Sequence, residues 1–399
     1  MSLLRFKYLH KHRLLTLILI LTLTSTLFSV TAFSFLGFYN GFTGYVGTQN
    51  DIVAIYQTKA NTPITGIVPL SLADSANAIH GVLATSAEVI VPCVVNDKSI
   101  FIRGILPESL SKINPLSTIE GSSLNENDTQ STIIGNGLQE NLKLKTGDNI
   151  TIYSVVSDKY VNVQVKGVFT SNSPLDDEAL VPIYVGQWLR GINYNEVTVI
   201  RAKIDPNQLT ADIIRQVIIN QTSQTPTITA SPPPIKGDTE QQLQGLIIIS
   251  QVNINLQNVG IEQAQDFMKN YLGQYGVSKD TLLILSALVL VFASGTAAAA
   301  LSLFINQHRN EIGTLRSIGA SNKKIKTDLI IKLTAWSLAA STMGTILSAA
   351  ILLIFQQLGY LQVLSHRLVF QLDPTIIAAN FILISALIAV GVTRLEMKP

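Results

Sequence analysis

The chain has 399 residues, with 28 Lys or Arg, 26 Asp or Glu and a formal net charge of +2. Charged residues make up 14% of the sequence, against roughly 25% in soluble globular domains, whereas the hydrophobic share is an ordinary 47%. This composition excludes an intrinsically disordered chain and a nucleic-acid-binding protein with a large basic excess. It indicates a protein that is part membrane-spanning and part water-facing. The single cysteine, Cys93, excludes an intrachain disulfide and a cysteine-based zinc cluster.

Four long runs without charged residues predict four transmembrane helices. About 20 residues of helix cross the hydrocarbon core of a bilayer. The first run has a basic start like that of a cleaved signal peptide. It exceeds the roughly 7–15 apolar residues of such a peptide, however, so we interpret it as a retained anchor. No run has an ionisable residue at its centre, which argues against an ion-coupled carrier. The predicted helices cover residues 14–36, 281–305, 333–355 and 374–393.

Lysine and arginine residues predict the orientation of these helices. They are concentrated in the N-terminal segment 1–13, the loop 306–332 and the C-terminal tail 394–399, whereas the loop 356–373 contains a single arginine. We therefore expect a multi-pass protein of the cell membrane with both termini and the loop 306–332 in the cytoplasm. Residues 37–280 are expected outside.

The predicted exterior region is acidic, because positions 40–280 contain 15 basic and 22 acidic residues. It also contains three Asn-x-Ser/Thr sequences, which are candidate N-glycosylation sites at Asn127, Asn149 and Asn220. An acidic exterior and basic cytoplasmic segments agree with the predicted orientation.

The residue patterns of the exterior region predict a mixed α/β fold. Residues 225–237 predict a loop, because they include three consecutive prolines. The Gln- and Asn-rich segment 239–280 has apolar residues at helical spacing and predicts a helical stalk that leads into the second apolar run. The predicted strands are 51–56, 88–95, 99–105, 131–134, 149–155, 160–170 and 197–202, and the predicted helices are 71–79, 138–142 and 210–220.

The sequence motifs that would carry catalysis or bind a cofactor are absent. There is no Gly-Lys dipeptide and so no Walker A loop, and there is no His-Glu-x-x-His motif. Asp176, Asp177 and Glu178 suggest a cation site, but we favour a solvated loop between strands. Cys93, in an apolar strand, is interpreted as a core residue rather than a reactive thiol. We therefore predict no catalytic residue, no metal ligand and no cofactor, and the energy source must lie in another subunit.

The cytoplasmic loop carries the most informative segment, NEIGTLRSIGASNKKI at 310–325. It predicts a continuation of the second helix that is broken at Gly319–Ala320–Ser321. Ser321 is a candidate N-cap for a following helix with lysines on its early face. The expected product is a short amphipathic element against the inner side of the membrane, and the alternative is a plain basic loop.

This segment resembles the signature of FtsX-like ABC transporter permeases, in which Glu-Ile-Gly-x-Leu-Arg-x-Ile-Gly-Ala follows the second of four helices. The exterior region is similar to the MacB-type core domain at 104–108, 134–148 and 165–169. Two departures are that the tail ends in Glu-Met-Lys-Pro rather than continuing with Glu-Ala-Leu, and that no ATPase domain is fused at the N-terminus. The residues of the predicted ATPase-coupling loop are Glu311, Ile312, Gly313, Leu315, Arg316, Ile318, Gly319, Ala320 and Ser321.

The resemblance implies an integral membrane α-helical protein with a large mixed α/β extracytoplasmic domain of the MacB core type between its first two helices. That domain would have an α/β part, at 46–112 and 190–237, interrupted by a smaller β-rich part at 113–189. The implied partners are a separate ABC ATPase subunit that binds the ATP, a second permease copy or paralogue, and membrane lipids.

The implied function is that of a permease subunit without catalysis of its own. It would couple ATP hydrolysis to movement of the exterior domain, which is called mechanotransmission, and would export or extract a lipoprotein, peptide or amphiphile. Spans without polar residues suit this role better than that of a solute channel. The small residues 294–300 permit close helix packing, although a plain lipid-facing helix is an equal alternative.

Two other functions were weighed. The first is an FtsX-like regulatory membrane protein that controls an extracytoplasmic partner protein such as a cell-wall hydrolase. The second is an exterior hydrolase on a membrane anchor, which we disfavour because no nucleophile–base pair stands out in the sequence.

Overall fold

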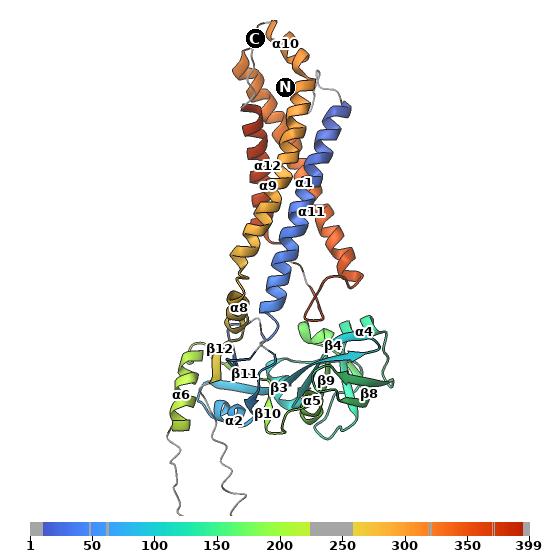
Figure 1. Ribbon diagram of the computed structural model, residues 1–399, viewed down its shortest axis with the longest axis vertical. Coiled ribbons are helices and arrows are strands. Elements are labelled where there is room, and N and C mark those ends of the chain that lie inside the picture. Colours follow the sequence, from blue (N-terminus) through green and yellow to red (C-terminus); the bar gives the residue numbers. More distant parts are fainter. Residues whose placement is uncertain are drawn as a thin grey trace, which may run out of the picture. The chain divides into compact units, whose positions relative to one another are not determined.

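The structure, a computed structural model, describes residues 11–47, 49–60, 64–223, 258–317, 319, 321–368, 370 and 372–393. The chain divides into two compact units (Figure 1). The helical unit contains the chain up to Phe42, Leu272–Val363 and the chain from Arg367 onward. The α/β unit contains Thr43–Tyr271 and, in addition, the short segment Leu364–His366.

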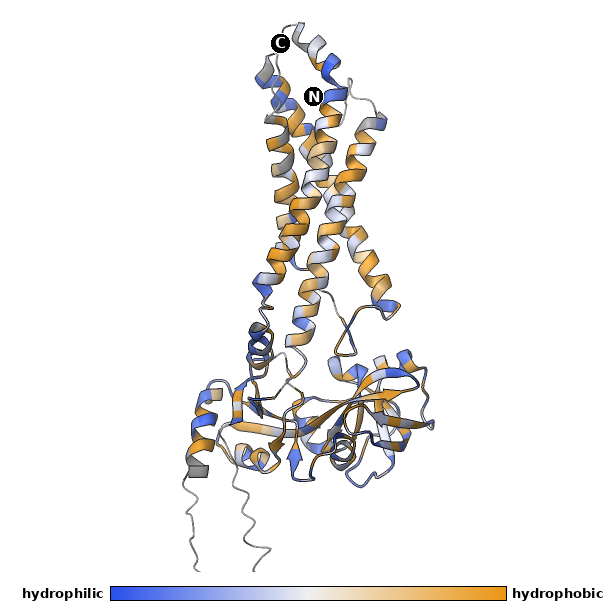
Figure 2. Cartoon of the chain, in the orientation of Figure 1, coloured by the Kyte–Doolittle hydropathy of each residue, from blue (hydrophilic) through white to orange (hydrophobic). Residues whose placement is uncertain are grey.

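Long apolar helices make up the helical unit, and Figure 2 shows them orange over most of their length. Three are long and apolar enough to cross a membrane, over Leu14–Thr43, Lys279–Gln307 and Lys323–Gln357, which confirms three of the predicted apolar helices. The fourth predicted run forms a helix of 20 residues. The helices of this unit are α1 (Lys11–Thr43), α9 (Lys279–Gln307), α10 (Arg309–Ser317), α11 (Asn322–Gln357) and α12 (Pro374–Thr393).

Two of these helices are longer than the sequence analysis predicted. Helix α1 continues to Thr43 rather than ending at residue 36, and α11 begins at Asn322 rather than 333. With 33 and 36 residues they are roughly 50 Å long at 1.5 Å per residue, which exceeds the hydrocarbon core of a bilayer. The lysines after Ser321 therefore belong to the first turns of a long apolar helix rather than to a loop that ends at residue 332.

The expectation of spans without polar residues is wrong, because a buried polar layer joins α1, α11 and α12. The Asn380 amide donates to Ser25 Oγ at 2.7 Å, and Ser25 Oγ donates to the carbonyl oxygen of Ser341 at 3.1 Å. All three side chains are fully buried. Small polar side chains that bond across helices are a common means of fixing helix packing in membranes.

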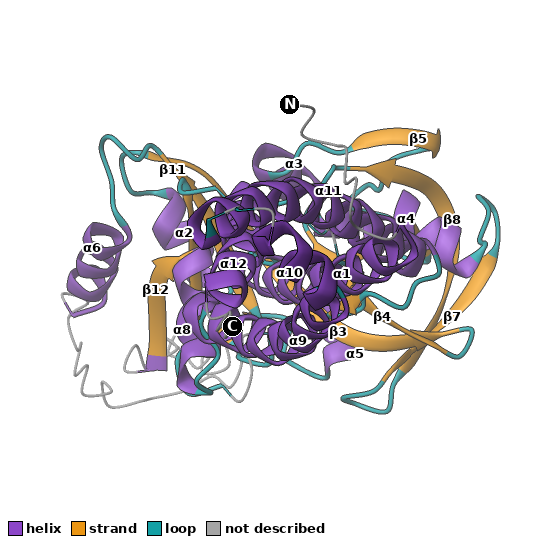
Figure 3. Ribbon diagram, turned by 90° about the horizontal axis from the view of Figure 1, so that it is seen from above, coloured by secondary structure: helices purple, strands orange, loops and turns teal. Residues whose placement is uncertain are grey.

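A sheet of ten strands forms the framework of the α/β unit, in the order β12-β1-β11-β3-β4-β9-β6-β8-β5, with β7 paired to β3 and β8. Figure 3 shows β11 and β12 at one end of the unit and β5, β7 and β8 at the other. The strands are β1 (Ile52–Gln57), β3 (Val82–Val95), β4 (Lys98–Ile105), β5 (Ser117–Gly121), β6 (Ser131–Gly135), β7 (Asn149–Ser154), β8 (Tyr160–Thr170), β9 (Ala179–Pro182), β11 (Val199–Ile204) and β12 (Val259–Gln263).

Short helices and two small sheets complete the described elements. Alternating apolar residues of the strands pack with these helices in one large core, which contains Val53, Val91, Ile102 and Leu189. One small sheet pairs β2 (Val68–Pro69) with β10 (Glu196–Val197), and the other pairs β13 (Gln362–Val363) with β14 (His366–Arg367). The helices are α2 (Ser71–Asn77), α3 (Pro107–Ile113), α4 (Asn136–Leu142), the 3-10 helix η1 (Pro174–Asp177), α5 (Ile183–Arg190), α6 (Ala211–Ser223) and α8 (Ala264–Gln274).

Each predicted strand and helix of the exterior region up to residue 223 corresponds to an observed one, with bounds shifted by a few residues. The 14-residue strand β3 starts at Val82, six residues before the predicted strand. The β-rich part predicted at 113–189 does not form a sheet of its own, because β9 pairs with β4 and β7 pairs with β3. Both parts share one sheet.

The helical stalk predicted for 239–280 is wrong in part. Residues Val259–Gln263 form the edge strand β12, which pairs antiparallel with β1 from Gln57↔Val259 to Val53↔Gln263. A helix, α8, follows directly. Residues 239–257 and the loop predicted at 225–237 lie outside the described residues.

Candidate functional site

The predicted coupling segment forms helix α10 and the turn that leads to α11. One residue, His308, separates α10 from the end of α9. After α10, Gly319 has a φ of +96°, in the left-handed region that glycine adopts without strain. Ser321 Oγ then accepts a hydrogen bond from the Lys324 N–H at 3.3 Å and caps α11. The predicted break and the predicted cap are both confirmed.

The two faces of α10 differ in burial. Ile312 is half-buried and packs against the apolar cluster of the helical unit that includes Leu14 and Phe304. Gly313 and Thr314 are exposed, and a Cβ added at Gly313 would meet nothing within 4 Å. The backbones of Glu311, Leu315 and Arg316 lie in α10 as well, whereas Ile318 and Ala320 lie outside the described residues.

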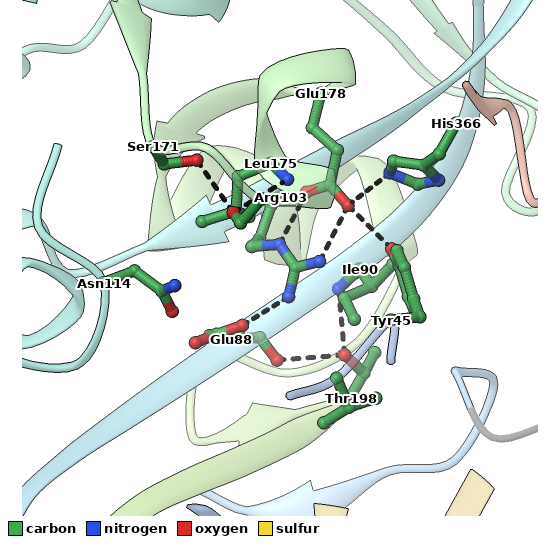
Figure 4. Close-up of polar contacts among 12 residues, drawn as sticks. Tyr45, Glu88, Ile90, Arg103, Asn114, Ser171, Leu175, Glu178, Thr198 and His366 are labelled. Atoms are coloured by element: carbon green, nitrogen blue, oxygen red, sulfur yellow. Dashed lines mark hydrogen bonds and ion pairs between the residues drawn. The ribbon is translucent and has the colours of Figure 1, made fainter. Parts of the chain in front are cut away.

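A group of buried charged residues lies in the α/β unit, and of these the sequence analysis had singled out Glu178 alone. We call Glu88, Arg103, Glu178 and Arg201 the buried charge cluster. Figure 4 labels the first three of them. Their exposed fractions are between 0 and 4%. Arg103 Nε and Nη2 donate to the two oxygens of Glu178 at 2.6 and 2.7 Å, and Arg103 Nη1 donates to Glu88 at 2.5 Å. Arg201 Nε donates to the other Glu88 oxygen at 2.7 Å.

The sheet register brings these four residues together. Glu88 is on β3 opposite Val199 of β11, and Arg103 is on β4 opposite Ile90 of β3. Glu178 immediately precedes β9, which pairs with β4. Neighbouring strands at the centre of the sheet therefore each supply one charged residue. The two negative charges of the carboxylates equal the two positive charges of the guanidinium groups.

The charges of the cluster keep both carboxyl groups ionised. Burial by itself raises the pKa of Glu178, but the charge and hydrogen bonds of Arg103 and the hydrogen bond from His366 lower it well below the usual range. Burial acts on Glu88 in the same way, and Arg201 and Arg103 lower its pKa. Burial opposes the charge of Arg103, whereas Glu178, Tyr45 and Glu88 raise its pKa. An ionised Glu178 is an acceptor only.

Two further donors complete the surroundings of Glu178. The Tyr45 hydroxyl donates to Glu178 Oε1 at 2.8 Å, and His366 Nε2 lies 2.9 Å from the same oxygen (Figure 4). Burial, followed by the charge of Glu178, raises the pKa of Tyr45 well above its usual value, so its hydroxyl keeps the proton that it donates.

The packing of η1 against β6 and α4 fixes the position of Glu178. A Cβ at Gly135 would lie 2.2 Å from the carbonyl oxygen of Asp176, so only glycine permits this approach. The Gly135 N–H donates to the carbonyl oxygen of Glu178 at 3.0 Å. The preference for a solvated loop at 176–178 is therefore wrong for Glu178, which is fully buried.

The neighbouring acidic residue is not placed to bind a cation with Glu178. The Asp176 carboxylate accepts from the backbone N–H of Ser171 at 2.6 Å and from Thr170 Oγ1 at 3.0 Å. Within the described ranges no group of three or more His, Cys, Asp or Glu side chains is placed to hold a metal ion. The candidate cation site suggested by the sequence is thus accounted for by protein hydrogen bonds.

The remaining candidate residues lie apart from the buried charge cluster. Cys93 is a core residue of β3, 1% exposed, and burial raises the pKa of its thiol to about 12. Of the candidate glycosylation sites, Asn127 is exposed in a turn and Asn149 is exposed at the start of β7. Asn220 lies in α6, and its side chain is outside the described residues.

Two family models match the chain. Residues 14–218 match the MacB-like periplasmic core domain, and residues 283–398 match the FtsX-like permease C-terminal model. A search of curated proteins finds no match.

Solved structures are also similar to the chain. The periplasmic region of MacB from Actinobacillus actinomycetemcomitans has 12% sequence identity and a TM-score of 0.35, and the match covers 55% of this chain and 92% of that chain. The extracellular domain of the noncanonic ABC-type transporter YknZ from Gram-positive bacteria has 15% identity and a TM-score of 0.32, and the match covers 44% of this chain and 96% of that chain.

The fold defines a class of membrane protein with long apolar helices and a large mixed α/β domain. Within that class, the chain belongs to the family of MacB/FtsX-like permeases. These are permease components of ABC transporters that work with ABC ATPase partners and are generally not enzymes by themselves. The periplasmic core domain of the family is extracytoplasmic, which places the α/β unit outside the cytoplasm.

Proposed function

We propose that this chain couples ATP hydrolysis by a separate ATPase subunit to movement of its α/β unit, and thereby exports or extracts a lipoprotein, peptide or amphiphile. The observation that carries the proposal is α10, a short helix outside the apolar helices that contains Glu311–Arg316 of the segment resembling the signature of FtsX-like permeases. It anchors through Ile312 and leaves Gly313 and Thr314 exposed to a partner. ATP binds to the partner, and the permease needs no cofactor of its own.

The proposed topology has four membrane spans. Helix α12, with 20 residues, is the fourth span beside α1, α9 and α11. Both termini and α10 face the cytoplasm, where the ATPase lies, and the α/β unit is inserted between the first and second spans. The working complex contains a second permease copy or paralogue and lies among membrane lipids.

Charge reversal in α10 tests the coupling function. Glu311→Lys or Arg316→Glu should lower stimulation of the co-purified ATPase by more than about tenfold, as expected for a central interface residue. The control is Asn310→Lys, which introduces a lysine at the neighbouring position, outside the matched residues of the motif. If both motif variants hydrolyse ATP and support function as the control does, α10 is not the coupling element.

A second candidate function, regulation of an extracytoplasmic partner such as a cell-wall hydrolase, is favoured by one surface. Tyr160 and Trp188 are 63% and 46% exposed, and Trp188 Nε1 donates to the Tyr160 carbonyl oxygen at 3.4 Å. Exposed aromatic groups of this kind are enriched at protein interfaces. Tyr153 is also exposed and is paired with Tyr160 across β7 and β8, so the aromatic patch consists of Tyr153, Tyr160 and Trp188.

Reconstitution separates the two candidates. Transport by the permease and ATPase alone supports export. If a purified cell-wall hydrolase binds the complex and Trp188→Ser abolishes that binding, regulation is supported instead. Ile213→Ser on α6 is the control, because Ile213 is also an exposed apolar residue, at 42%, but lies on another element.

A further inference from the structure

Two segments that adjoin apolar helices meet at one carboxylate of the α/β unit. Tyr45 follows the end of α1 by two residues, and His366 lies in the connection between α11 and α12. Both residues belong to the α/β unit and bond to Glu178 Oε1. They are 133 and 188 residues from Glu178 along the chain, so the fold alone brings them together.

These two bonds are additional to an ion pair that is already complete. Arg103 donates hydrogen bonds to both carboxylate oxygens of Glu178. Each carboxylate oxygen of Glu88 likewise accepts a hydrogen bond, one from Arg201 and one from Arg103. Balancing the charges of the sheet therefore requires neither Tyr45 nor His366. Because Glu178 is ionised, His366 Nε2 must carry the hydrogen that lies between them.

The segment after α1 is held at a second point. Arg201 Nη1 donates to the carbonyl oxygen of Val46 at 3.3 Å. The adjacent residues Tyr45 and Val46 therefore contact two different members of the buried charge cluster, Glu178 and Arg201. The Tyr45 ring lies 4.9 Å from the His366 ring, and Phe101 of β4 stacks on His366 with a ring-centroid separation of 5.9 Å. The two segments thus contact each other as well as the sheet.

The turn that carries His366 is conformationally unfavourable by itself. Leu364 and Ser365 have φ values of 51° and 60°, and a two-residue hairpin with both residues in this region ordinarily uses Asn and Gly. A bulky leucine there is a rare conformation that persists only where surrounding contacts enforce it. The contact of His366 with Glu178 directly follows this turn.

We propose that Tyr45, Glu178 and His366 form a joint through which displacement of the segments adjoining α1 and α11–α12 is passed to the central strands β3 and β4. Tyr45 and His366 are positioning residues that transmit displacement to Glu178, and Arg103 carries it on to both strands. The inference rests on the proposed function and assigns the place where movement enters the α/β unit.

The test is hydrogen exchange of the full-length permease with its co-purified ATPase in nanodiscs, with and without ATP. His366→Leu and Tyr45→Phe each remove one donor to Glu178, and His366→Gln retains a donor. Tyr184→Phe is the matched control, because the Tyr184 hydroxyl donates to the Asp128 carbonyl oxygen at 2.7 Å elsewhere in the unit. Continued protection of Cys93 from a thiol reagent verifies that each variant is folded.

In the wild-type complex, ATP should change exchange in β3 and β4. In His366→Leu, exchange of the 362–367 hairpin should rise by roughly tenfold or more, as expected when a hydrogen bond to a charged group is lost. The ATP-dependent change in β3 and β4 should disappear in His366→Leu and weaken in Tyr45→Phe, while ATP hydrolysis continues. His366→Gln should restore part of the change.

Two results would overturn the proposal in distinguishable ways. If His366→Leu keeps the full ATP-dependent change seen in Tyr184→Phe, the joint does not transmit displacement, although the proposed function stands. If the wild-type complex shows no ATP-dependent change in the α/β unit, the proposed function fails and the joint fails with it.

Discussion

Arg103 is the residue on which the centre of the sheet depends. Its guanidinium group contacts Glu88 and Glu178, and all three side chains are almost completely buried. A buried ion pair is weak evidence of net stabilisation, because removing ions from water is costly. Removal of one partner is nevertheless strongly destabilising, since it leaves a buried charge without compensation.

Arg103→Met should therefore lower the free energy of unfolding of the α/β unit by about 3–5 kcal/mol. The measurement is denaturant unfolding of the full chain in detergent, and labelling of Cys93 with a thiol reagent monitors it. Cys93 is the only cysteine of the sequence and is 1% exposed, so it reacts when the α/β unit unfolds. The control is Lys166→Met, because the partly exposed Lys166–Asp128 pair is worth at most about 1 kcal/mol. Equal losses in the two variants would contradict the role assigned to Arg103.

The lowered pKa values of Glu88 and Glu178 predict the effect of acid on the α/β unit. Because both pKa values are lower in the folded state, the unfolded state binds more protons in acid. The stabilisation is therefore complete above the unfolded-state value of about 4.3 and is lost as the pH falls towards the folded-state values. Denaturation midpoints should be constant from neutral pH to about pH 5 and fall below it.

Cys93 labelling with a pyridyl disulfide, which reacts with thiols in acid, measures this pH dependence in the full chain. Arg103→Met is the comparison, because the guanidinium group of Arg103 helps to lower the pKa of both Glu88 and Glu178. The denaturation midpoint of this variant should therefore fall less steeply below pH 5. A midpoint that rises as the pH falls from 5 to 3 would contradict the charge states assigned to the cluster.

The sequence contains part of the signal for this cluster. Glu88, Arg103 and Arg201 are each a single charge within an apolar predicted strand, and such charges are rarely buried without a partner. Their pairing could not be predicted, since it follows from the order and register of strands far apart in the chain. The contact of His366 with Glu178 has no local signal at all, because it joins residues 188 positions apart.

Gly344 lies where α1 and α11 approach each other closely. A Cβ added at Gly344 would lie 2.4 Å from Ser25 Oγ and 2.8 Å from the Thr22 carbonyl oxygen. Gly344→Ala should therefore displace the helices and cost about 1–3 kcal/mol, as overpacking typically does. Gly295→Ala in α9 is the matched control, because a Cβ there meets nothing within 4 Å.

Resistance of the helical unit to unfolding by SDS measures this effect, with Trp336 fluorescence in a Trp188→Phe background. The control variant should unfold at the wild-type SDS fraction and Gly344→Ala at a lower one. If the two glycine variants unfold together, the close approach of α1 and α11 at Ser25 is not as described.

Helices and strands were predicted correctly where the local residue pattern favours the same conformation as the tertiary contacts. The apolar runs and the strand at 160–170 were predicted well, because composition and alternation are local properties. Strand β12 was predicted as part of a helical stalk, because the Gln- and Asn-rich segment around it has apolar residues at helical spacing. Pairing with β1 decides its conformation instead. A helix after Ser321 was predicted, but its continuity with the third apolar run was missed, because residues 306–332 were assigned to a separate loop.

At the scale of the whole molecule, the charge is distributed unevenly along the chain, as the proposed topology requires. Residues 40–280 carry seven more acidic than basic residues (22 against 15), whereas the whole chain has a net charge of +2. The sequence alone indicated this asymmetry and the family motif. The inferred joint of Tyr45, Glu178 and His366 depends on contacts within the α/β unit that only the folded chain reveals.

The central claim is that α10 contacts the ATPase, and cysteine crosslinking tests it most directly. Thr314→Cys places a thiol on the exposed side of α10, and Gln357→Cys places one at the far end of α11, where the side chain is also exposed. Burial already protects Cys93, so the native cysteine needs no substitution. We predict that a maleimide crosslinker joins Thr314→Cys to the co-purified ATPase and leaves Gln357→Cys unlinked. Crosslinking from Gln357→Cys alone, or from neither position in an intact complex, would contradict the account.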